Sequence, residues 1–319
     1  MVNESPTGEA VLKKQVGKRR PRIEDFSHTF KLFIKNRIAF IGFVIVIIYF
    51  AIMILDYADP RWLGVADINT MASWAPKPLM SAGIPSGPTF TRGWWYIFGE
   101  TEYFVPIFPV MLAALKTDLT YSVAIVTTGV LIGTILGTLS GYFGKLYDEI
   151  LMRITDIFYS VPTLVLAIAV TYVLGFSLRN VVLALMIIWW PIYARLTRGV
   201  TLTIKSNKFV EAATASGSSG IRNVFVHVLP NVLSVVLVQF SLDLGSIIQL
   251  FAALDYIGFN RAAPLLPEIG NMLNMGETYL AAGIWWPIVI PGIFLLIFTV
   301  AINLMGDGLR DVLDPKLRR

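Results

Sequence analysis

Side chains able to carry out covalent or metal chemistry are scarce in this chain of 319 residues. The absence of cysteine excludes disulfides, thiolate catalysis and cysteine metal sites. Its two histidines, His28 and His227, lie far apart in the sequence and cannot supply a histidine-rich metal site alone. No Gly-x-x-x-x-Gly-Lys-Ser/Thr phosphate loop is present, so a nucleotide that drives this protein must bind another subunit. The sequence therefore predicts no catalytic residue, no metal site and no cofactor held by this chain.

A polar segment with helix-forming composition, residues 209–231, separates two long apolar runs. Alanine and glutamate favour a helix over 209–216, and Gly217 is expected to end it. A serine after the glycine can cap a second helix over 221–229, before Pro230 marks the entry into the next apolar run. Two short helices joined at a glycine would form a rigid element able to transmit force. The alternative is a simple re-entry turn.

The composition is that of an integral membrane protein. The chain is 55% hydrophobic and only 15% charged, whereas soluble domains carry about 25% charged residues. Residues 38–55 contain no charge and would reach about 27 Å as a helix, close to the thickness of the hydrocarbon layer. This run begins too late for a signal peptide, and no small-residue cleavage site follows it.

Six apolar runs predict an all-α membrane protein with transmembrane helices at 38–55, 119–143, 154–174, 181–198, 231–254 and 283–305. A shorter run, 104–116, holds two prolines and is expected to be interfacial or re-entrant. With both termini in the cytoplasm, 20 of the 26 Lys and Arg residues fall in cytoplasmic segments, as the positive-inside rule requires. The net charge of +5 is thus topological, and no nucleic-acid partner is expected.

The predicted organisation is a cytoplasmic tail with an amphipathic helix (1–37), a first span (38–55), an extracellular segment (56–118), a five-span core (119–305) containing a cytoplasmic loop (199–230), and a cytoplasmic tail (306–319). Residues 22–37 alternate apolar and basic positions, which suits a helix lying on the inner leaflet, although a simple basic flank explains them equally well. The Trp-, Pro- and Gly-rich outer segment is either a structured subdomain or a membrane-interface anchor.

The polar segment also carries a motif, EAA followed by three residues, G, nine residues and H-x-L-P-N. This pattern resembles the EAA loop of ABC importer permeases, and its ending is similar to the dipeptide/oligopeptide/nickel branch. In that family the loop forms a coupling helix that docks into a groove on a cytoplasmic ATPase. The resemblance implies a coupling role for Glu211, Ala212, Ala213, Gly217, Arg222, His227, Leu229, Pro230 and Asn231.

The resemblance covers most of the chain. Residues 33–37 are similar to the family's N-terminal elbow, residues 141–162 to its connection between the second and third spans, and residues 303–315 are typical of the C-type permease subunit. Two segments depart from the family pattern. Residues 98–101 hold only a remnant of the Gly-Thr-Asp…Gly-Arg-Asp motif, and 254–258 read Leu-Asp-Tyr-Ile-Gly instead of Leu-Ser-Phe-Leu-Gly. Both face outside in the predicted topology, which puts the substrate class in doubt more than the mechanism.

The resemblance implies a six-span permease subunit with the type I ABC importer fold, located in the plasma (inner) membrane and making or breaking no bond itself. Its expected partners are a homologous B-type permease, two ABC ATPases that bind ATP and Mg, an extracellular solute-binding protein and membrane lipid. The expected cargo is a di- or oligopeptide, carried by alternating access.

Three alternatives stay open at this point. The first is an importer of oligosaccharides or another small solute, nickel included. The second is an ion-coupled secondary transporter, although the chain has no repeated halves or paired broken helices and this class leaves 209–231 unexplained. The third is a structural membrane anchor, in which Glu211 and Gly217 would be replaceable at no cost.

The second apolar run carries Gly129, Gly133, Gly137 and Gly141 at four-residue spacing. This spacing places them on one helix face, where another backbone can approach closely. Static helix packing explains the pattern. A surface that slides during alternating access is the functional hypothesis.

A carboxylate, Asp243, lies within the fifth run, with Gln239 four residues earlier on the same helix face. A charge at membrane depth is costly and usually faces the bundle interior or a wet cavity. One hypothesis is a pathway group that meets the ammonium end of a peptide; the other is an internal hydrogen bond to a neighbouring helix. Asp156, at the start of the third run, is expected to pair locally with Arg153.

Overall fold

Helices dominate the computed structural model, which describes residues 33–58, 83–101, 104–259 and 267–313. The long ones are α3 (Arg37–Ala58), α5 (Ile107–Phe143), α8 (Leu178–Lys205), α11 (Leu229–Tyr256) and α13 (Trp286–Leu313). Within the described residues, five helices are long and apolar enough to cross a membrane, or six if one bent pair counts as a single span. The predicted all-α membrane fold is confirmed, with five to six candidate spans.

The bent pair is α6 (Lys145–Tyr159) and α7 (Thr163–Leu174), whose axes differ by 90°. The break lies just before Pro162, which precedes the first residue of α7. Proline lacks an N–H and pushes the preceding residue out of the helical region, so the chain cannot continue straight. The prediction of one continuous helix over 154–174 is therefore wrong.

Helix α5 also differs from the prediction, because it begins earlier in the chain than the predicted span. It has 37 residues and starts at Ile107, so it absorbs most of the run 104–116. At about 1.5 Å per residue it is roughly 55 Å long, far more than the hydrocarbon layer. Pro106 directly precedes the helix and Pro109 lies in its first turn, where N–H groups have no partner within the helix. Most of the run 104–116 is therefore part of α5 and not a separate interfacial or re-entrant segment, and the predicted boundary at residue 118 falls inside a helix.

Helices α5 and α8 pack along the four glycines predicted to share one face. A Cβ atom on Gly133 would lie 2.3 Å from the Trp190 carbonyl oxygen, and one on Gly137 would lie 2.1 Å from the Ala194 carbonyl oxygen. Gly141 meets the Arg198 carbonyl at 2.8 Å in the same sense. These distances are too short for any side chain, so the two backbones touch only because the positions are glycine. Gly129 continues the row, with Trp189 Cδ1 at 3.1 Å.

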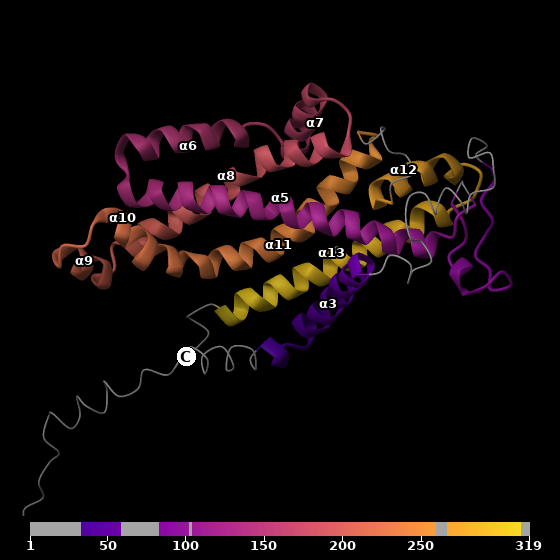
Figure 1. Cartoon of the computed structure of the whole chain (residues 1–319), viewed down its shortest axis with the longest axis horizontal. Helices are drawn as coiled ribbons and strands as arrows, with labels where there is room; N and C mark the ends of the chain where they lie inside the picture. Colours follow the sequence, from indigo (N-terminus) through magenta and orange to yellow (C-terminus); the bar gives the residue numbers. More distant parts are fainter. Residues whose placement is uncertain (1–32, 59–82, 102–103, 260–266, 314–319) are drawn as a thin grey trace, which may run out of the picture.

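The bundle is elongated, and its two ends are built differently (Figure 1). One end holds the short helix η2 (Trp94–Tyr96) and α12 (Ile269–Leu280), which was not predicted. The opposite end holds α9 (Lys208–Ala215) and α10 (Gly220–Arg222), from the segment 209–231. Regions predicted to lie on opposite sides of the membrane thus occupy opposite ends of the molecule.

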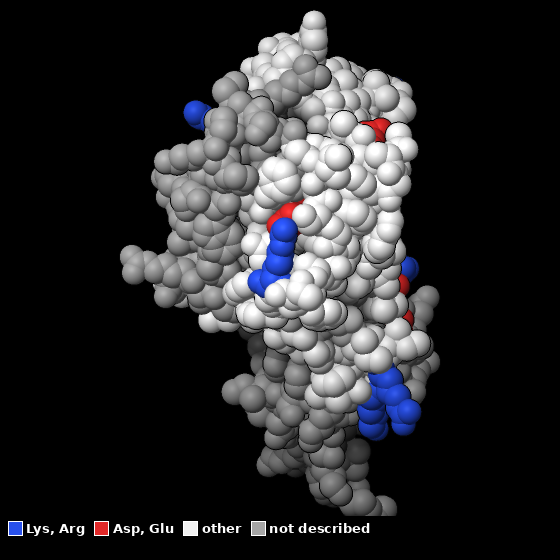
Figure 2. Space-filling model, turned by 90° about the vertical axis from the view of Figure 1, so that its right-hand side faces the viewer, with Lys and Arg blue, Asp and Glu red and all other residues white. Residues whose placement is uncertain are grey.

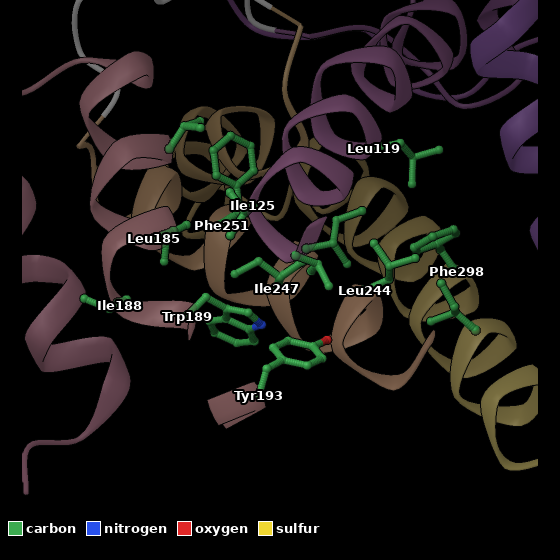
Figure 3. Close-up of a cluster of buried hydrophobic side chains, with 14 of the residues drawn as sticks. Leu119, Ile125, Leu185, Ile188, Trp189, Tyr193, Leu244, Ile247, Phe251 and Phe298 are labelled. Carbon is green, nitrogen blue, oxygen red and sulfur yellow. The ribbon is translucent and has the colours of Figure 1, made fainter. Parts of the chain in front are cut away.

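Two apolar cores hold the structure together. The larger one joins α5, α8, α11 and α13, and Figure 3 shows part of it. Its labelled members are Leu119, Ile125, Leu185, Ile188, Trp189, Tyr193, Leu244, Ile247, Phe251 and Phe298. The smaller core packs the start of α5, through side chains such as Ile107 and Met111, against Ile269 and Met272 of α12. The end formed by η2 and α12 is therefore a packed unit rather than a loose connection.

The surface carries much apolar side-chain area. Helix α3 exposes residues such as Ile38, Ile41 and Ile54, each more than half exposed. Figure 2 looks at the end formed by η2 and α12 and shows few charged side chains among the described residues on that face. Just before the first residue of α3, Phe33 packs with Ala39 and with Val312 of α13, so the first and last described parts of the chain are in contact. The rest of the predicted amphipathic segment, 22–32, lies outside the described residues.

Candidate functional site

The segment predicted to couple transport to a partner has the expected jointed shape. Helix α9 ends at Ala215, and Gly217 adopts a φ of +85°, a left-handed conformation that glycine takes without strain. Ser219 then caps α10, because its hydroxyl accepts the N–H of Arg222 at 3.4 Å. Two helical pieces therefore meet at a glycine, as the sequence predicts.

The second piece differs from the prediction. Helix α10 passes into a π-helical turn, Asn223–Val228, which continues directly into α11. The chain from 220 to 256 is thus one long apolar helix, and no separate helix ends at Pro230. A π-turn widens the hydrogen-bond ring, which accommodates the N–H that Pro230 lacks. Such turns are rare and occur often at functional sites.

The predicted coupling residues fall into two groups along this path. Glu211, Ala212, Gly217 and Arg222 are exposed at the tip of the molecule, and Ala213 beside them is half-buried. His227, Leu229, Pro230 and Asn231 lie further in, where the π-turn meets α11. There the Asn231 side chain donates to the carbonyl oxygen of His227 at 2.7 Å. The first group is exposed at the surface, and the second belongs to the helix behind it.

A groove of about 780 Å³ runs beside α9. Its walls come from the ends of α5 and α8 next to α9 and from α9 itself, and the lining residues include Glu211 and Thr214. Lys205, at the end of α8, donates to the backbone oxygen of Tyr142 and lies 5.3 Å from the centre of that ring. The end of α5 is thereby fixed next to the coupling segment.

Ion pairs brace α6 against α8 near the same end. Arg198 donates two hydrogen bonds to Asp148, of 2.5 and 2.7 Å, and the Ser140 hydroxyl donates to the same carboxylate. This bidentate geometry is the strong form of such a pair. Asp156 pairs with Arg195 of α8 at 2.5 Å, not with Arg153. The expected local pair is therefore wrong, because α8 packs alongside α6 and brings Arg195 to Asp156, while Arg153 pairs with Glu149.

Asp243 is buried on α11 and bonded on both sides. Its two oxygens accept the indole N–H of Trp189 at 3.2 Å and the amide of Gln239 at 2.7 Å. Trp189 belongs to α8, so the bond crosses between helices, as one of the two hypotheses for this residue requires. Beside Trp189 lies a small hollow of about 70 Å³, lined also by Tyr159 and Thr163.

Sequence reasoning missed a second buried acidic group, at the end that holds α12. Asp118, Asp255 and Glu268 are at most 1% exposed. Glu268 accepts the backbone N–H groups of Gly270 and Asn271 and so caps α12, and Asp118 accepts that of Ile269 at 3.2 Å. Burial, with Asp118 nearby, raises the pKa of Glu268 well above its usual range. The signal was an acidic residue directly before a helix-forming stretch.

It also missed Asn223. This amide is fully buried in the π-turn and donates to side chains of α5 and α9. The available signal was a single amide within the otherwise apolar stretch 223–226.

The chain resembles proteins of known type along most of its length. Residues 129–319 match the family model described as binding-protein-dependent transport system inner membrane component. A dipeptide transport system permease protein, DppC, of Alkalihalophilus pseudofirmus is 32% identical over 93% of this chain and 91% of its own.

Two further relatives align over shorter stretches. A probable D,D-dipeptide transport system permease protein, DdpC, of Escherichia coli is 39% identical over 69% of this chain and 73% of its own. A glutathione transport system permease protein, GsiD, of Pectobacterium atrosepticum is 38% identical over 66% and 70%. These matches confirm the resemblance drawn from the EAA loop. The chain belongs to the family of inner membrane components of binding-protein-dependent transport systems, and is a multi-pass permease subunit of an ABC importer in the plasma membrane.

Proposed function

We propose that this permease carries di- or oligopeptides into the cell by alternating access, driven by partner ATPases. The observation that carries the proposal is the alignment, over nearly the whole chain, with a permease named for dipeptide transport. Other relatives are named for a D,D-dipeptide and for glutathione, which are also peptides. The chain itself makes and breaks no bond, and the ATPases bind ATP and Mg.

The proposed topology has six spans, with α6 and α7 together forming one broken crossing and both termini in the cytoplasm. The contact of Phe33 with Val312 supports the termini sharing a side, and the distribution of Lys and Arg supports the inside assignment. A homologous B-type permease completes the translocation pathway. A solute-binding protein docks at the end formed by η2 and α12, and two ATPases dock at the opposite end.

Coupling is assigned to α9 and the glycine joint after it. ATP-driven closure of the ATPases would pull this helix and open the cavity outward, and hydrolysis would reset it. The exposure of Glu211, Ala212 and Gly217 at the tip supports this role. The second group, His227 to Asn231, would pass the movement into α11 through the continuous helix.

Asp243 is proposed as a pathway group that meets the ammonium end of a peptide. The partly exposed Gln239 amide supports this, because it links the buried carboxylate to the helix surface. Asp243→Asn keeps the size of the side chain but removes its charge. We expect a several-fold loss of uptake for a free dipeptide and little change for its N-acetylated form. Unchanged uptake and selectivity would leave Asp243 with its hydrogen bond to α8 alone.

A second candidate cargo is an oligosaccharide. The aromatic rings of Trp94 and Trp95 stack at 3.5 Å, and Trp94 is 57% exposed, so a flat apolar surface is available for a sugar ring. The purified solute-binding partner, titrated with a panel of peptides and sugars, separates the two cargoes. Peptide binding in the micromolar range or tighter supports the main proposal, and binding of sugars alone contradicts it.

A further inference from the structure

The buried amide of Asn223 joins three segments that are distant in sequence. Its Nδ2 atom donates to the hydroxyl of Tyr142, at the inner end of α5, at 3.1 Å. The same nitrogen donates to Oγ1 of Thr214, on α9, at 2.9 Å. Asn223 itself lies in the π-turn that leads into α11. One side chain thus contacts the coupling helix α9 and the long helix α5, from a turn that is continuous with α11.

Both acceptors are themselves held in place. The Thr214 hydroxyl donates to the carbonyl oxygen of Val210 at 2.9 Å, so it faces Asn223 as an acceptor fixed to α9. The backbone of Tyr142 accepts from Lys205, as described above. A Cβ atom on Gly220 would lie 3.4 Å from Cε1 of Tyr142 and 3.0 Å from Cε1 of Phe143, so the loop backbone lies directly against these rings. The junction is therefore tightly confined on each side.

Packing alone does not account for an amide at this position. Asn223 is 0% exposed, and its Oδ1 atom has no hydrogen-bond partner among the described residues. A buried polar atom without a partner costs about 1–3 kcal/mol. Leucine has a similar volume and would bury no such atom. The two donated hydrogen bonds are what distinguishes asparagine from leucine here.

We propose that Asn223 is the positioning residue that ties the coupling helix α9 to the inner end of α5. This inference rests on the coupling role proposed for the segment. A displacement of α9 moves Thr214, and Asn223 carries it to Tyr142 and so to α5. Helix α5 contacts α8 through its glycine face, where the backbones leave no slack. The movement thereby reaches the core helices directly as well as through the chain into α11.

The test uses the complete transporter, with its second permease, ATPases and binding protein, in proteoliposomes. Asn223→Leu removes both donated bonds, while Tyr142→Phe and Thr214→Val each remove one acceptor with little change in volume. Ser160→Ala is the matched control, because that exposed hydroxyl also donates to a nearby backbone carbonyl oxygen, that of Ile157, and lies outside 209–231. For each variant, the measurements are dipeptide transported per ATP hydrolysed, the KM for ATP, and the amount of ATPase that co-purifies.

We expect the ratio of dipeptide to ATP to fall about two- to tenfold in Tyr142→Phe and in Thr214→Val, the range that corresponds to one neutral hydrogen bond. It should fall at least as far in Asn223→Leu, which removes both bonds. ATPase co-purification, the KM for ATP and the Ser160→Ala ratio should stay at the wild-type level. The double variant Tyr142→Phe/Thr214→Val should resemble Asn223→Leu, since all of these changes act on one network.

Wild-type ratios in Tyr142→Phe and Thr214→Val would overturn the inference. So would a loss of ATPase binding that leaves the ratio unchanged, because the junction would then serve assembly alone. If Asn223→Leu fails to assemble, the two hydroxyl variants decide the matter. Uptake by the unmodified transporter that needs no ATP would instead overturn the proposed function, and the inference with it.

Discussion

Single polar side chains mark the places where the helices of this permease meet. Asp243 joins α11 to α8 through Trp189, Asn223 joins α9 to α5, and Glu268 begins α12 beside Asp118. Each is almost fully buried, and burial of a polar group is tolerated only where hydrogen bonds offset its desolvation. The sequence predicts Asp243 because an acidic residue is conspicuous in an apolar run. Asn223 and Glu268 lie outside the predicted spans, where polar residues are ordinary.

The acidic group at α12 makes stability depend on pH. Glu268 has a raised pKa in the folded protein, so the folded state holds a proton that the unfolded state releases. The contribution of Glu268 to folding stability is complete below pH 4.5, the ordinary pKa of a glutamate, and is lost as the pH rises through the raised pKa of the folded state. The charge of nearby Asp118 acts in the same direction as burial, whereas hydrogen bonds from the backbone of Gly270 and Asn271 and with the Asp255 side chain act in the opposite direction; burial is the largest cause, and the pKa of Glu268 is raised.

We therefore expect the melting temperature of the purified transporter to fall as the pH rises above about 4.5. Glu268→Gln mimics the protonated form, so its melting curve should change less with pH. Glu277→Gln, at an exposed position of the same helix, is the control. Scanning fluorimetry across the pH range makes the comparison. Parallel pH dependence in wild type and Glu268→Gln would show that this carboxyl does not hold the proton.

At the scale of elements, the contact between α5 and α8 depends on glycine. Gly133→Ala should lower stability by about 1–3 kcal/mol, because its Cβ atom would overlap the Trp190 carbonyl and force the helices apart. Gly133→Leu should impair assembly or turnover outright. Gly199→Ala is a matched control inside α8, since nothing lies within 4 Å of the added Cβ atom. Thermal melting of both variants checks this; equal melting temperatures would contradict the packing account.

The helix boundaries show which features of the fold can be predicted from the sequence and which cannot. Apolar runs locate the long helices because a bilayer demands about 20 apolar residues in a row. They do not reveal that α5 begins as early as Ile107. Pro106 and Pro109 would break a helix if they lay in its interior, but the first turn of a helix tolerates proline, and that is where the structure places them. At Pro162 the error is the reverse, because the prediction lacks a break: the apolar run continues across this residue, while the backbone turns by 90°. Hydropathy measures solvent preference, and direction depends on local backbone geometry.

The coupling segment could be read more fully than any other site. Its joint can be predicted from the residue type, because glycine adopts a φ such as the +85° of Gly217 without strain. Its fusion with α11 through the π-turn could not be predicted, since single-residue widening of a helix leaves no periodic signal. The contact of Asn223 with Tyr142 joins residues 81 positions apart and depends on tertiary packing.

Across the whole molecule, we expect the two ends to have different roles in transport. The end with η2 and α12 is packed, and its described residues expose few charged side chains on the face drawn in Figure 2. The segments that depart from the family pattern, 98–101 and 254–258, lie near this end or within it. The opposite end carries the EAA loop and the ion pairs that brace α6 against α8. Substrate choice is therefore expected to depend on the first end and energy coupling on the second.

The most direct test of this division separates capture from coupled uptake. Glu211→Lys reverses the charge at the exposed tip, and Gly217→Pro forbids the left-handed joint, because proline fixes φ near −65°. Glu149→Lys, an exposed charge reversal on α6, is the control. In proteoliposomes with all partners, we predict that docking of the loaded binding protein survives in both variants while ATP-dependent dipeptide uptake falls at least tenfold. Normal uptake in both variants would contradict the assignment of 209–231 as the coupling segment.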